Sequence, residues 1–452
     1  MNALNKEILR LSIPSILANL TVPLVGMVDT ALAGHLTGGS GAAAYIGAIS
    51  LGSMLFNLLY WNFSFLRTGT GGLTAQAFGR RDDKGCALML SRGLVLSIGM
   101  SLVVLALQLP FMKLGLLCVH GSPASEELAS TYFRIRIWAA PATLSLMTFS
   151  GWFVGMQDSR SSMWKDFIVN GVNIAASIIL TFGIGSRKGL GFAGIAWGTV
   201  IAQYSGLLYC LVKTCLKYGR NVLSRMSRED LRGIMSRSEM RAYFGMNTNL
   251  FLRSVFFTLI YIGYTMIAAR YGDLMLSCSA IMMQLLMIFS YFTDGFAYAG
   301  EALTGRFIGA KDSQMLRRSV KYIFAWSMSI AALFVLIYGV GGKPLLGLLT
   351  DDAEVFGACC EFLPWLLAMP LLGCAAFTWD GVYLGATASA GIRNAMGGAA
   401  VSFFLIWFAG VFILHPQGSA AIHLLLAAYF AHLTFRTVLL TVRYRRDILS
   451  RL

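Results

Sequence analysis

One carboxylate, Asp29, lies deep in an apolar stretch that predicts a membrane span over residues 10–35. An ionisable residue inside a span costs about 2.5–3.5 kcal/mol on insertion scales, so it usually faces protein or water. Such a carboxylate can take up a proton near neutral pH, or it can bind sodium together with neighbouring oxygens. Pro23, two turns earlier, lacks a backbone donor and can bend the helix. We therefore expect Asp29 to bind a coupling cation beside a hinge at Pro23; the alternative is a hydrogen-bonded structural acid.

The second half of the chain carries four ionisable residues in or near its apolar stretches: Arg253, Asp294, Glu301 and Asp380. Asp294 and Glu301 are seven residues apart and share a helix face. Three acids against one cation leave negative charge, which suits a cationic substrate or coupling ion. We expect these four residues to line a substrate cavity. The alternatives are a structural pair between Arg253 and one acid, and a cytoplasmic position for Glu301.

Other patterns that could carry chemistry are weak. The segment RTGTGG at 67–72 lacks the Gly-Lys-Ser/Thr ending of a phosphate loop and favours close helix packing. The segment GGSG at 38–41 has no histidine base nearby and predicts a flexible turn. The eight cysteines form no CxxC pair, and the five histidines share no close spacing, which favours packing and interfacial roles. The sequence therefore predicts no enzyme, no metal site and no cofactor.

The composition indicates which solvent surrounds these residues. Apolar residues make up 57% of the 452 residues and charged residues only 13%, and apolar runs long enough to cross a bilayer recur throughout. We expect an all-α integral membrane protein in the lipid bilayer, with twelve spans. The predicted spans cover residues 10–35, 44–66, 87–109, 130–156, 163–184, 190–212, 244–269, 276–300, 320–341, 358–386, 394–414 and 419–441.

The formal charge of +15 follows the topology. Lys and Arg gather in the two tails, in the even-numbered loops and in a basic linker over residues 213–243, whereas the opposite loops hold few. The positive-inside rule then places both termini in the cytoplasm and the chain in the cell (inner) membrane. The first span is longer than a signal-peptide core and is expected to be retained. No polar basic surface remains for nucleic acid.

An internal repeat connects the two halves of the chain. Seven residues of the first half recur with the same identity 230 positions later: Leu73, Thr74, Gly79, Asp82, Gly151, Gly155 and Ser159 match Leu303, Thr304, Gly309, Asp312, Gly381, Gly385 and Ser389. Each repeat has six spans, so the two should be related by a pseudo-two-fold axis along the membrane normal. We expect an N-lobe at 1–212 and a C-lobe at 244–452, as in a transporter that works by alternating access.

Three segments resemble the DinF branch of the MATE (multidrug and toxic compound extrusion) transporters. They are SIPSILANLTVPLVGMVDTALAGHL at 12–36, YFTDGFAYAGEALTGRFIGAKD at 291–312 and TWDGVYLGATASAGIRNAM at 378–396. The resemblance covers nearly the whole chain. It implies the MATE fold of two six-helix bundles and the export of organic cations and drugs in exchange for protons or sodium. We expect a monomer.

The resemblance also implies site residues. Asp29 matches the coupling aspartate of the first helix, Asn173 an asparagine of the fifth helix, and Asp380 an acid of the tenth helix. Ser177 stands where several members carry a second fifth-helix aspartate, and a single carboxylate makes a poor sodium site. The sequence therefore favours proton coupling at Asp29, with Asn173 and Thr199 as hydrogen-bonding neighbours. We expect the coupling site to comprise Asp29, Asn173, Thr199 and Ser177.

Three classes of function follow, in this order: a cation-coupled antiporter for small organic, cationic or amphipathic compounds, a flippase for lipid-linked precursors with a related two-lobed fold, and a membrane enzyme. A flippase for pyrophosphate head groups would need several basic residues in its cavity. The sequence places Arg67 and Arg253 within spans, where the acids outnumber them. This balance favours the antiporter.

Overall fold

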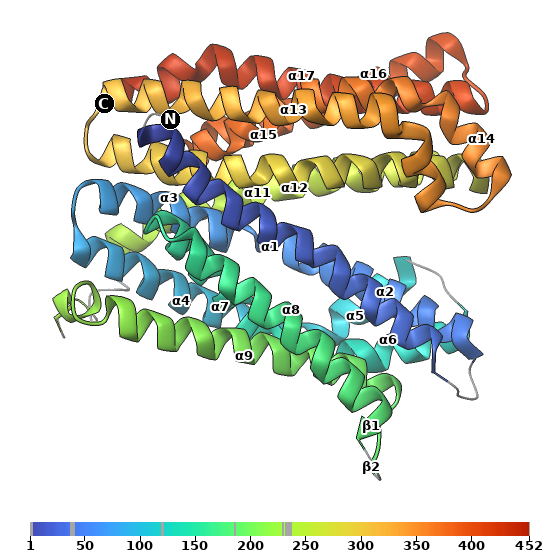
Figure 1. The fold of residues 1–452 in the computed structure, drawn as a ribbon, viewed down its shortest axis with the longest axis horizontal. Coiled ribbons are helices and arrows are strands. Elements are labelled where there is room, and N and C mark those ends of the chain that lie inside the picture. Colours follow the sequence, from blue (N-terminus) through green and yellow to red (C-terminus); the bar gives the residue numbers. More distant parts are fainter. Residues whose placement is uncertain are drawn as a thin grey trace. The chain divides into compact units, whose positions relative to one another are not determined.

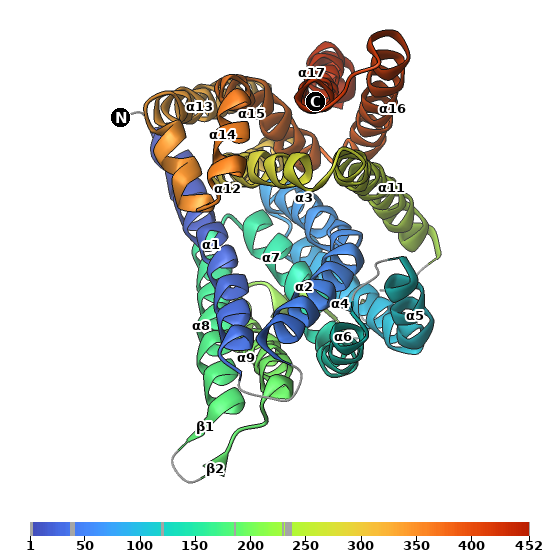
Figure 2. The same cartoon turned by 90° about the vertical axis from the view of Figure 1, so that its right-hand side faces the viewer.

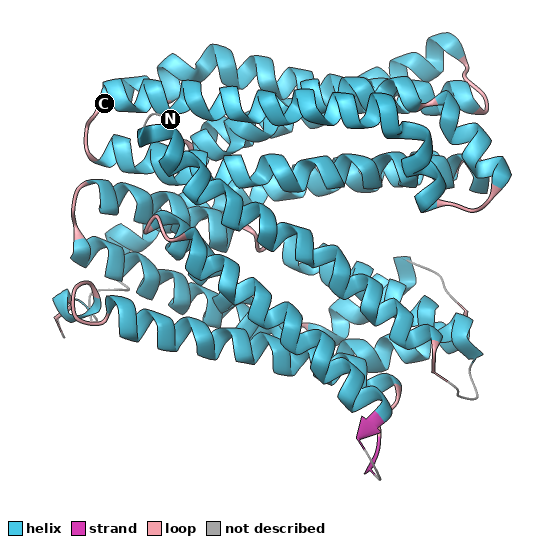
Figure 3. Ribbon diagram, in the orientation of Figure 1, coloured by secondary structure: helices cyan, strands magenta, loops and turns pink. Residues whose placement is uncertain are grey.

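The computed structural model describes residues 3–36, 41–118, 122–184, 187–227, 230 and 237–451. Most of the GGSG segment and part of the basic linker lie outside the described residues. The described chain is almost entirely helical, and twelve of its helical stretches are long and apolar enough to cross a membrane (Figure 3). This confirms the predicted all-α class and all twelve spans.

The first six spans follow one another from residue 3 to residue 218 (Figure 1). The second is broken at residues 62–64, and the fourth passes through a short 3-10 turn. Their elements are α1 (Ala3–Gly34), α2 (Gly41–Trp61) with α3 (Phe65–Gly79), α4 (Asp83–Ala106), α6 (Pro123–Arg136) with η1 (Ile137–Ala139) and α7 (Ala140–Gly155), α8 (Ser159–Phe182), and α9 (Phe192–Tyr218). Short elements connect or follow them: α5 (Gln108–Cys118), the hairpin β1 (Gly183–Ile184) and β2 (Arg187–Lys188), and η2 (Leu223–Arg225).

The other six spans begin after the linker. In Figures 1 and 2 α16 and α17 run side by side. The elements are α11 (Arg237–Ala269), α12 (Asp273–Gly309), α13 (Ser313–Leu349), α15 (Leu363–Gly385), α16 (Ser389–Leu414) and α17 (Ser419–Asp447), with the short α14 (Ala353–Glu361) and the terminal η3 (Leu449–Arg451).

The chain divides into two compact units. The N-terminal unit comprises residues 17–241, and the C-terminal unit comprises residues 242–452 together with the start of α1 up to Ile16. Within the C-terminal unit, the start of α1 is held by an ion pair between Glu7 and Arg306 and by close packing of Ile16 on Gly295. The predicted N-lobe contained all of α1, whereas the structure divides this helix between the units.

The two units repeat the same local geometry at the predicted offset. Asp82 caps α4 by accepting from Gly85 N at 2.8 Å, and Asp312 caps α13 by accepting from Met315 N at 2.9 Å. The residue before each capping aspartate has a left-handed backbone, with φ 57° at Arg81 and 55° at Lys311. A second pair of left-handed residues, also 230 positions apart, is Gln157 and Thr387. The repeated residues thus set repeated helix boundaries.

Glycines of the repeat allow two helices to touch in each unit. A Cβ atom on Gly151 would lie 2.0 Å from the carbonyl oxygen of Arg67, and one on Gly381 would lie 2.0 Å from that of Ala297. Both partners are again 230 positions apart. The glycines of RTGTGG take part, because a Cβ on Gly155 would lie 2.7 Å from Gly71 O. The segment is therefore a packing surface of α3 against α7.

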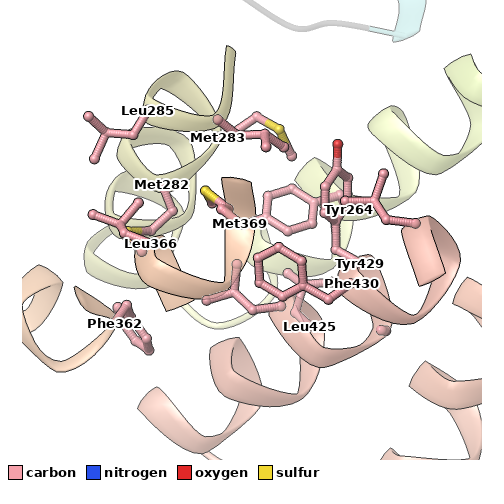
Figure 4. Close-up of a cluster of buried hydrophobic side chains, with 14 of the residues drawn as sticks. Tyr264, Met282, Met283, Leu285, Phe362, Leu366, Met369, Leu425, Tyr429 and Phe430 are labelled. Atoms are coloured by element: carbon pink, nitrogen blue, oxygen red, sulfur yellow. The ribbon is translucent and has the colours of Figure 1, made fainter. Parts of the chain in front are cut away.

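Apolar side chains fill the interior of each unit, and others cover the outside. In the C-terminal unit, Met282, Met369 and Tyr429 belong to one buried cluster from α12, α15 and α17 (Figure 4). Large apolar side chains such as Leu216 and Val340 are more than 80% exposed. Exposed side chains of this kind suit lipid contact.

Candidate functional site

Asp29 is buried within a helix whose neighbouring side chains point outward. The Asp29 side chain is only 6% exposed, whereas Met27, two residues before it, is 67% exposed. Among the described residues, no donor hydrogen-bonds to Asp29 Oδ1. Burying a charged carboxylate costs free energy when one of its oxygens accepts no hydrogen bond. The carboxylate is therefore suited to bind a proton or to pair with a cation.

Asn173 and Thr199 meet where α8 and α9 pack closely. A Cβ atom on Gly198 would lie 2.7 Å from Ser177 Cα, so the glycine permits this approach. Asn173 Nδ2 donates to Thr199 Oγ1 at 3.0 Å, while Asn173 Oδ1 is buried without a described partner. The Ser177 hydroxyl donates to the Ile195 carbonyl at 3.5 Å. Ser177 thus serves the helix contact, and Asn173 presents a second unpaired oxygen.

A cation that the sequence reading missed, Arg136, belongs to the same unit. Arg136 Nη1 donates to the Tyr132 hydroxyl at 2.7 Å, and the guanidinium carbon lies 4.6 Å from the centre of the Phe56 ring. Arg136 is the charged side chain that acts electrostatically on Asp29. The signal was present in the sequence, because Arg136 lies inside the predicted span 130–156.

Tyr132 connects the carboxylate to the amide. Its side chain is fully buried, and it interacts with Asp29, with Arg136 and with Thr199. Through Thr199 the contact continues to Asn173. Asn173 and Thr199 are therefore joined by a hydrogen bond, and Asp29 is related to them through its electrostatic interaction with Tyr132 and Arg136. We call these five residues the Asp29 network.

The predicted hinge lies within a continuous helix. α1 runs unbroken from Ala3 to Gly34, so Pro23 does not end it. Two residues before Pro23, Thr21 Oγ1 accepts from Asn170 Nδ2 at 2.5 Å, which fastens α1 to α8. The division between the two units also falls in this helix, after Ile16. The role of Pro23 as a hinge stays a prediction.

The C-terminal unit contains a buried ion pair. Arg253 Nη2 donates to Asp380 Oδ2 at 2.5 Å, and Arg436 Nη2 lies 3.6 Å from the same oxygen. Arg436 on α17 is 1% exposed and was missed by the sequence reading, although it lies inside the predicted span 419–441. The expected balance of three acids to one cation therefore becomes three acids to two cations, because Arg436 shares Asp380 with Arg253.

The other two predicted cavity acids have different surroundings. Asp294 is partly exposed and acts electrostatically on Arg436. Glu301 is fully buried on the same helix, which contradicts the alternative that it faces the cytoplasm. The assignment of these acids, Arg253 and Asp380 to a substrate cavity stays a prediction.

Further cations lie inside spans. Arg92 and Lys165 are both buried in the N-terminal unit, and Lys165 Nζ donates to Ser150 Oγ at 2.6 Å. Ser150 corresponds to Asp380 in the repeat, so each unit directs a cation to this position. The premise that only Arg67 and Arg253 lie within spans is thus wrong.

His432, on the same helix as Arg436, is fully buried instead of interfacial. In the part of the chain that the structure describes, no three His, Cys, Asp or Glu side chains form a group that could hold a metal ion.

Comparisons with known proteins agree with this architecture. The MatE family model matches residues 14–206 and 250–390. The chain is 33% identical over 403 residues to DNA damage-inducible protein F of Escherichia coli, which covers 89% of this chain and 85% of that protein. It is 26% identical over 360 residues to a probable multidrug resistance protein NorM of Photorhabdus laumondii, which covers 77% and 75%.

The fold is also shared with solved transporters. The structure of the Vibrio cholerae MATE transporter VcmN in its bent form superposes with a TM-score of 0.83 at 16% identity, covering 99% of this chain and 98% of that one. At this identity the likeness concerns the fold alone. The family model and the Escherichia coli relative carry the assignment: this chain belongs to the MATE family of transporters.

Proposed function

We propose that this transporter exports small organic compounds in exchange for protons that enter the cell, with Asp29 as the residue that carries the proton. The observation that supports the proposal is the buried Asp29 carboxylate, one oxygen of which has no described hydrogen-bond donor. A proton neutralises such a group without needing further ligands. The driving ion comes from the gradient, so the proposal requires no cofactor and no catalytic group.

The proton would act through helix α1. Protonation removes the charge of Asp29 and weakens its attraction to Arg136, so the two states of the carboxylate favour different packing around α1. Pro23 lies between Asp29 and the end of α1 that packs in the C-terminal unit, at the point where a helix bends most readily. A bend of α1 at Pro23 would collapse the N-terminal side of the substrate-binding cavity and release the substrate. Deprotonation of Asp29 to the cytoplasm would then return the helix to its first conformation.

Sodium is the less favoured coupling ion. Sodium needs several oxygen ligands, and only one of those in the Asp29 network is a carboxylate. Ser177, in the place of a second acid, directs its hydroxyl to a backbone carbonyl. Asn173 Oδ1 and Asp29 Oδ1 remain as acceptors, which a proton shared through water or side chains can use.

For the substrate we propose small amphipathic compounds, including organic cations. The C-terminal unit contains the carboxylates of Asp294, Glu301 and Asp380, which favour a positively charged substrate. Asp380, which is paired with Arg253, contributes less of this attraction than an isolated carboxylate would. The chain contains 22 methionines, 30 phenylalanines and 17 tyrosines, and side chains of these kinds suit varied apolar groups. The relatives named as multidrug resistance proteins agree with a broad substrate range.

The basic segments and the exposed apolar side chains bear on where the protein lies in the cell. The basic linker and tails favour cytoplasmic termini and an inner-membrane location, and the protein would work as a monomer with lipid around it. The exposed apolar side chains of both units fit such a setting.

A flippase for lipid-linked precursors is the second candidate. The buried Arg436, together with Arg253, favours it, because guanidinium groups bind phosphate well. Asp380 and Asp294 oppose it, since they already act on these two arginines. A head group would have to displace a carboxylate that is 2.5 Å from Arg253.

Transport into inverted proteoliposomes tests the proposal. A fluorescent cation is offered under an imposed proton gradient, under a sodium gradient, and under neither. We expect accumulation with the proton gradient and its loss on addition of an uncoupler. Accumulation that depends on the sodium gradient alone would show that sodium is the coupling ion. Movement of a fluorescent lipid-linked phosphate without any gradient would favour the flippase.

A further inference from the structure

Arg136 is held by aromatic side chains of the buried cluster that packs on both sides of Asp29. Leu32 belongs to the same cluster as Phe56 and Tyr132, and Val28 packs against it. The guanidinium of Arg136 donates to the Tyr132 hydroxyl at 2.7 Å and stacks over Phe56 at 4.6 Å and over Tyr132 at 5.5 Å. We call Phe56 and Tyr132 the aromatic cage of Arg136. Phe56 is 1% exposed and Tyr132 is fully buried, so the cage is part of the packed interior. A caged guanidinium keeps its charge, because arginine does not lose its proton in proteins.

The cage fixes the electric charge of the Asp29 network. When Asp29 is ionised, its negative charge and the positive charge of Arg136 sum to zero. Asn173, Thr199 and Tyr132 add polar atoms without adding charge. A sodium ion bound to Asp29 would therefore bring the network to a net charge of +1, in an interior where like charges repel strongly.

We propose that Arg136 is a tethered cation that balances the charge of ionised Asp29 and excludes sodium from the Asp29 network. The inference rests on the proposed function, since it explains why a proton can couple at Asp29 and sodium cannot. Arg136 is a positioning residue in this scheme. It supplies the charge that a free metal ion would otherwise supply, and it remains attached to α6.

The cage explains how the arginine can release its partner. When Asp29 is protonated, the guanidinium keeps Tyr132 as a hydrogen-bond acceptor and the faces of Phe56 and Tyr132 as cation-π partners. The charged and titratable groups that act on Arg136 are Asp29, Tyr132 and Tyr60, and those coupled to Asp29 are Arg136 and Tyr132. Both protonation states of Asp29 thus leave Arg136 with polar or aromatic partners.

A purely structural cation is the competing explanation. Arg136 would then stabilise the packing of Phe56 and Tyr132 without any influence on which ion binds. The two explanations differ when the positive charge is removed and the site is offered sodium. A structural cation predicts a less stable protein that still ignores sodium, whereas a tethered cation predicts a protein that acquires a sodium site.

Sodium binding to the purified full-length protein in nanodiscs separates them. The binding of ²²Na⁺ and the sodium-induced shift of the melting temperature are measured at constant ionic strength, with choline in place of sodium as the control. Wild type should show no specific binding. Arg136→Gln should gain saturable sodium binding, with a bound amount about tenfold or more above the wild-type background. Arg136→Lys, which keeps the charge, should behave as wild type.

The double variant Arg136→Gln with Asp29→Asn identifies the site. It should lose the sodium binding that the single variant gained. Sodium binding to wild type that disappears in Asp29→Asn would overturn the inference, and this result does not depend on the folding of any arginine variant. A folded Arg136→Gln, or Arg136→Met if the glutamine variant fails to fold, that binds no sodium would also overturn it.

Measuring sodium binding also distinguishes a failure of the tethered cation from a failure of the proposed function. Sodium binding requires no substrate, so a wrong substrate leaves the test intact. Proton-driven export by wild type with no sodium site in Arg136→Gln would refute only the tethered cation. A sodium site in Arg136→Gln without proton-driven export by wild type would refute only the proposed function.

Discussion

Arg253 on α11 donates to Asp380 on α15 with only 2.5 Å between Nη2 and Oδ2. Both side chains are mostly buried, at 18% and 11% exposure. Breaking a buried pair by removing one partner is costly, because the other charge is left uncompensated. The pair therefore gives Asp380 a structural role that is separate from any contact with substrate.

Asp380→Asn should destabilise the protein more than Arg253→Gln. The first change leaves two guanidinium groups without their shared carboxylate, at a cost of about 3–5 kcal/mol, whereas the second leaves Arg436 beside Asp380. Thermal unfolding in detergent measures the difference. Export of cationic and neutral substrates should fall together in Asp380→Asn. If only the export of cationic substrates fell and the melting temperature did not change, Asp380 would be assigned to the lining of the substrate cavity.

Asp29→Asn should abolish proton-driven export while the protein remains folded and inserted. Asparagine has nearly the same shape, but it cannot take up a proton. The measurement is accumulation in proteoliposomes at equal protein content. The exposed acid Asp273 offers the matched control, since Asp273→Asn should transport as wild type. Undiminished gradient-driven transport by Asp29→Asn would remove Asp29 from the coupling role.

Thr199→Val should slow proton-driven export by about fivefold. Valine keeps the volume but removes the hydroxyl that accepts from Asn173 and interacts with Tyr132, at a cost of about 1 kcal/mol. Initial rates of transport over a pH series give the effect. Ser205→Ala, on the exposed side of the same helix, is the control and should leave the rate unchanged. Equal rates for both variants would place Thr199 outside the network.

The fold could be predicted from the sequence because its signals are local and repeated. Apolar runs of bilayer length predicted all twelve spans, and the 230-residue offset predicted paired features that the structure contains as paired caps and glycine contacts. Capping aspartates and contact glycines act on their immediate surroundings, so identical residues produce identical geometry. The division of α1 between two units could not be predicted, since a continuous apolar helix carries no mark of where its packing partner changes.

The candidate site could be predicted only in part. Asp29, Asn173 and Thr199 belong to one network, but the cations opposite the acids were missed. Arg136 and Arg436 lie inside predicted spans, so a full count of charged residues would have found them. Their partners could not have been found in that way, because Arg436 and Asp380 come from helices that are distant in sequence. Counting acidic and basic residues in the sequence gives the net charge of a region, but it does not identify which residues form ion pairs.

Gly151→Ala and Gly381→Ala should both reduce the yield of folded protein. The added Cβ atom would lie 2.0 Å from a backbone oxygen in each case, and a backbone atom cannot rotate away as a side chain can. Overpacking of this kind costs about 1–3 kcal/mol or more. Gly171→Ala is the control, because no atom lies within 4 Å of its Cβ position. Size-exclusion profiles in detergent measure the yield, and normal profiles for all three would contradict the packing argument.

Asp158, between α7 and α8, should make stability depend on pH. Burial alone would raise the pKa of this carboxyl, but hydrogen bonds from Lys217 and Ser161 outweigh burial and hold the pKa below its ordinary value. Lys217 Nζ lies 2.7 Å from Asp158 Oδ2, and Ser161 Oγ lies 2.6 Å from it. A lowered pKa in the folded state means that the unfolded chain binds the proton first. The stabilisation is therefore complete above about pH 4 and is lost as the pH falls through the folded pKa.

The melting temperature of wild type should accordingly decrease as the pH falls below about 4, and Asp158→Asn should decrease less over the same interval. At neutral pH the variant should be less stable by about 1.5–3 kcal/mol, because it loses hydrogen bonds to a charged acceptor. Asp351→Asn, at an exposed position, is the control and should follow the wild-type curve. If Asp158→Asn and wild type gave parallel curves, the carboxylate would not contribute its charge to the folded state. Lys217→Met should reproduce part of the loss at neutral pH, since it removes the donor at 2.7 Å while Ser161 remains.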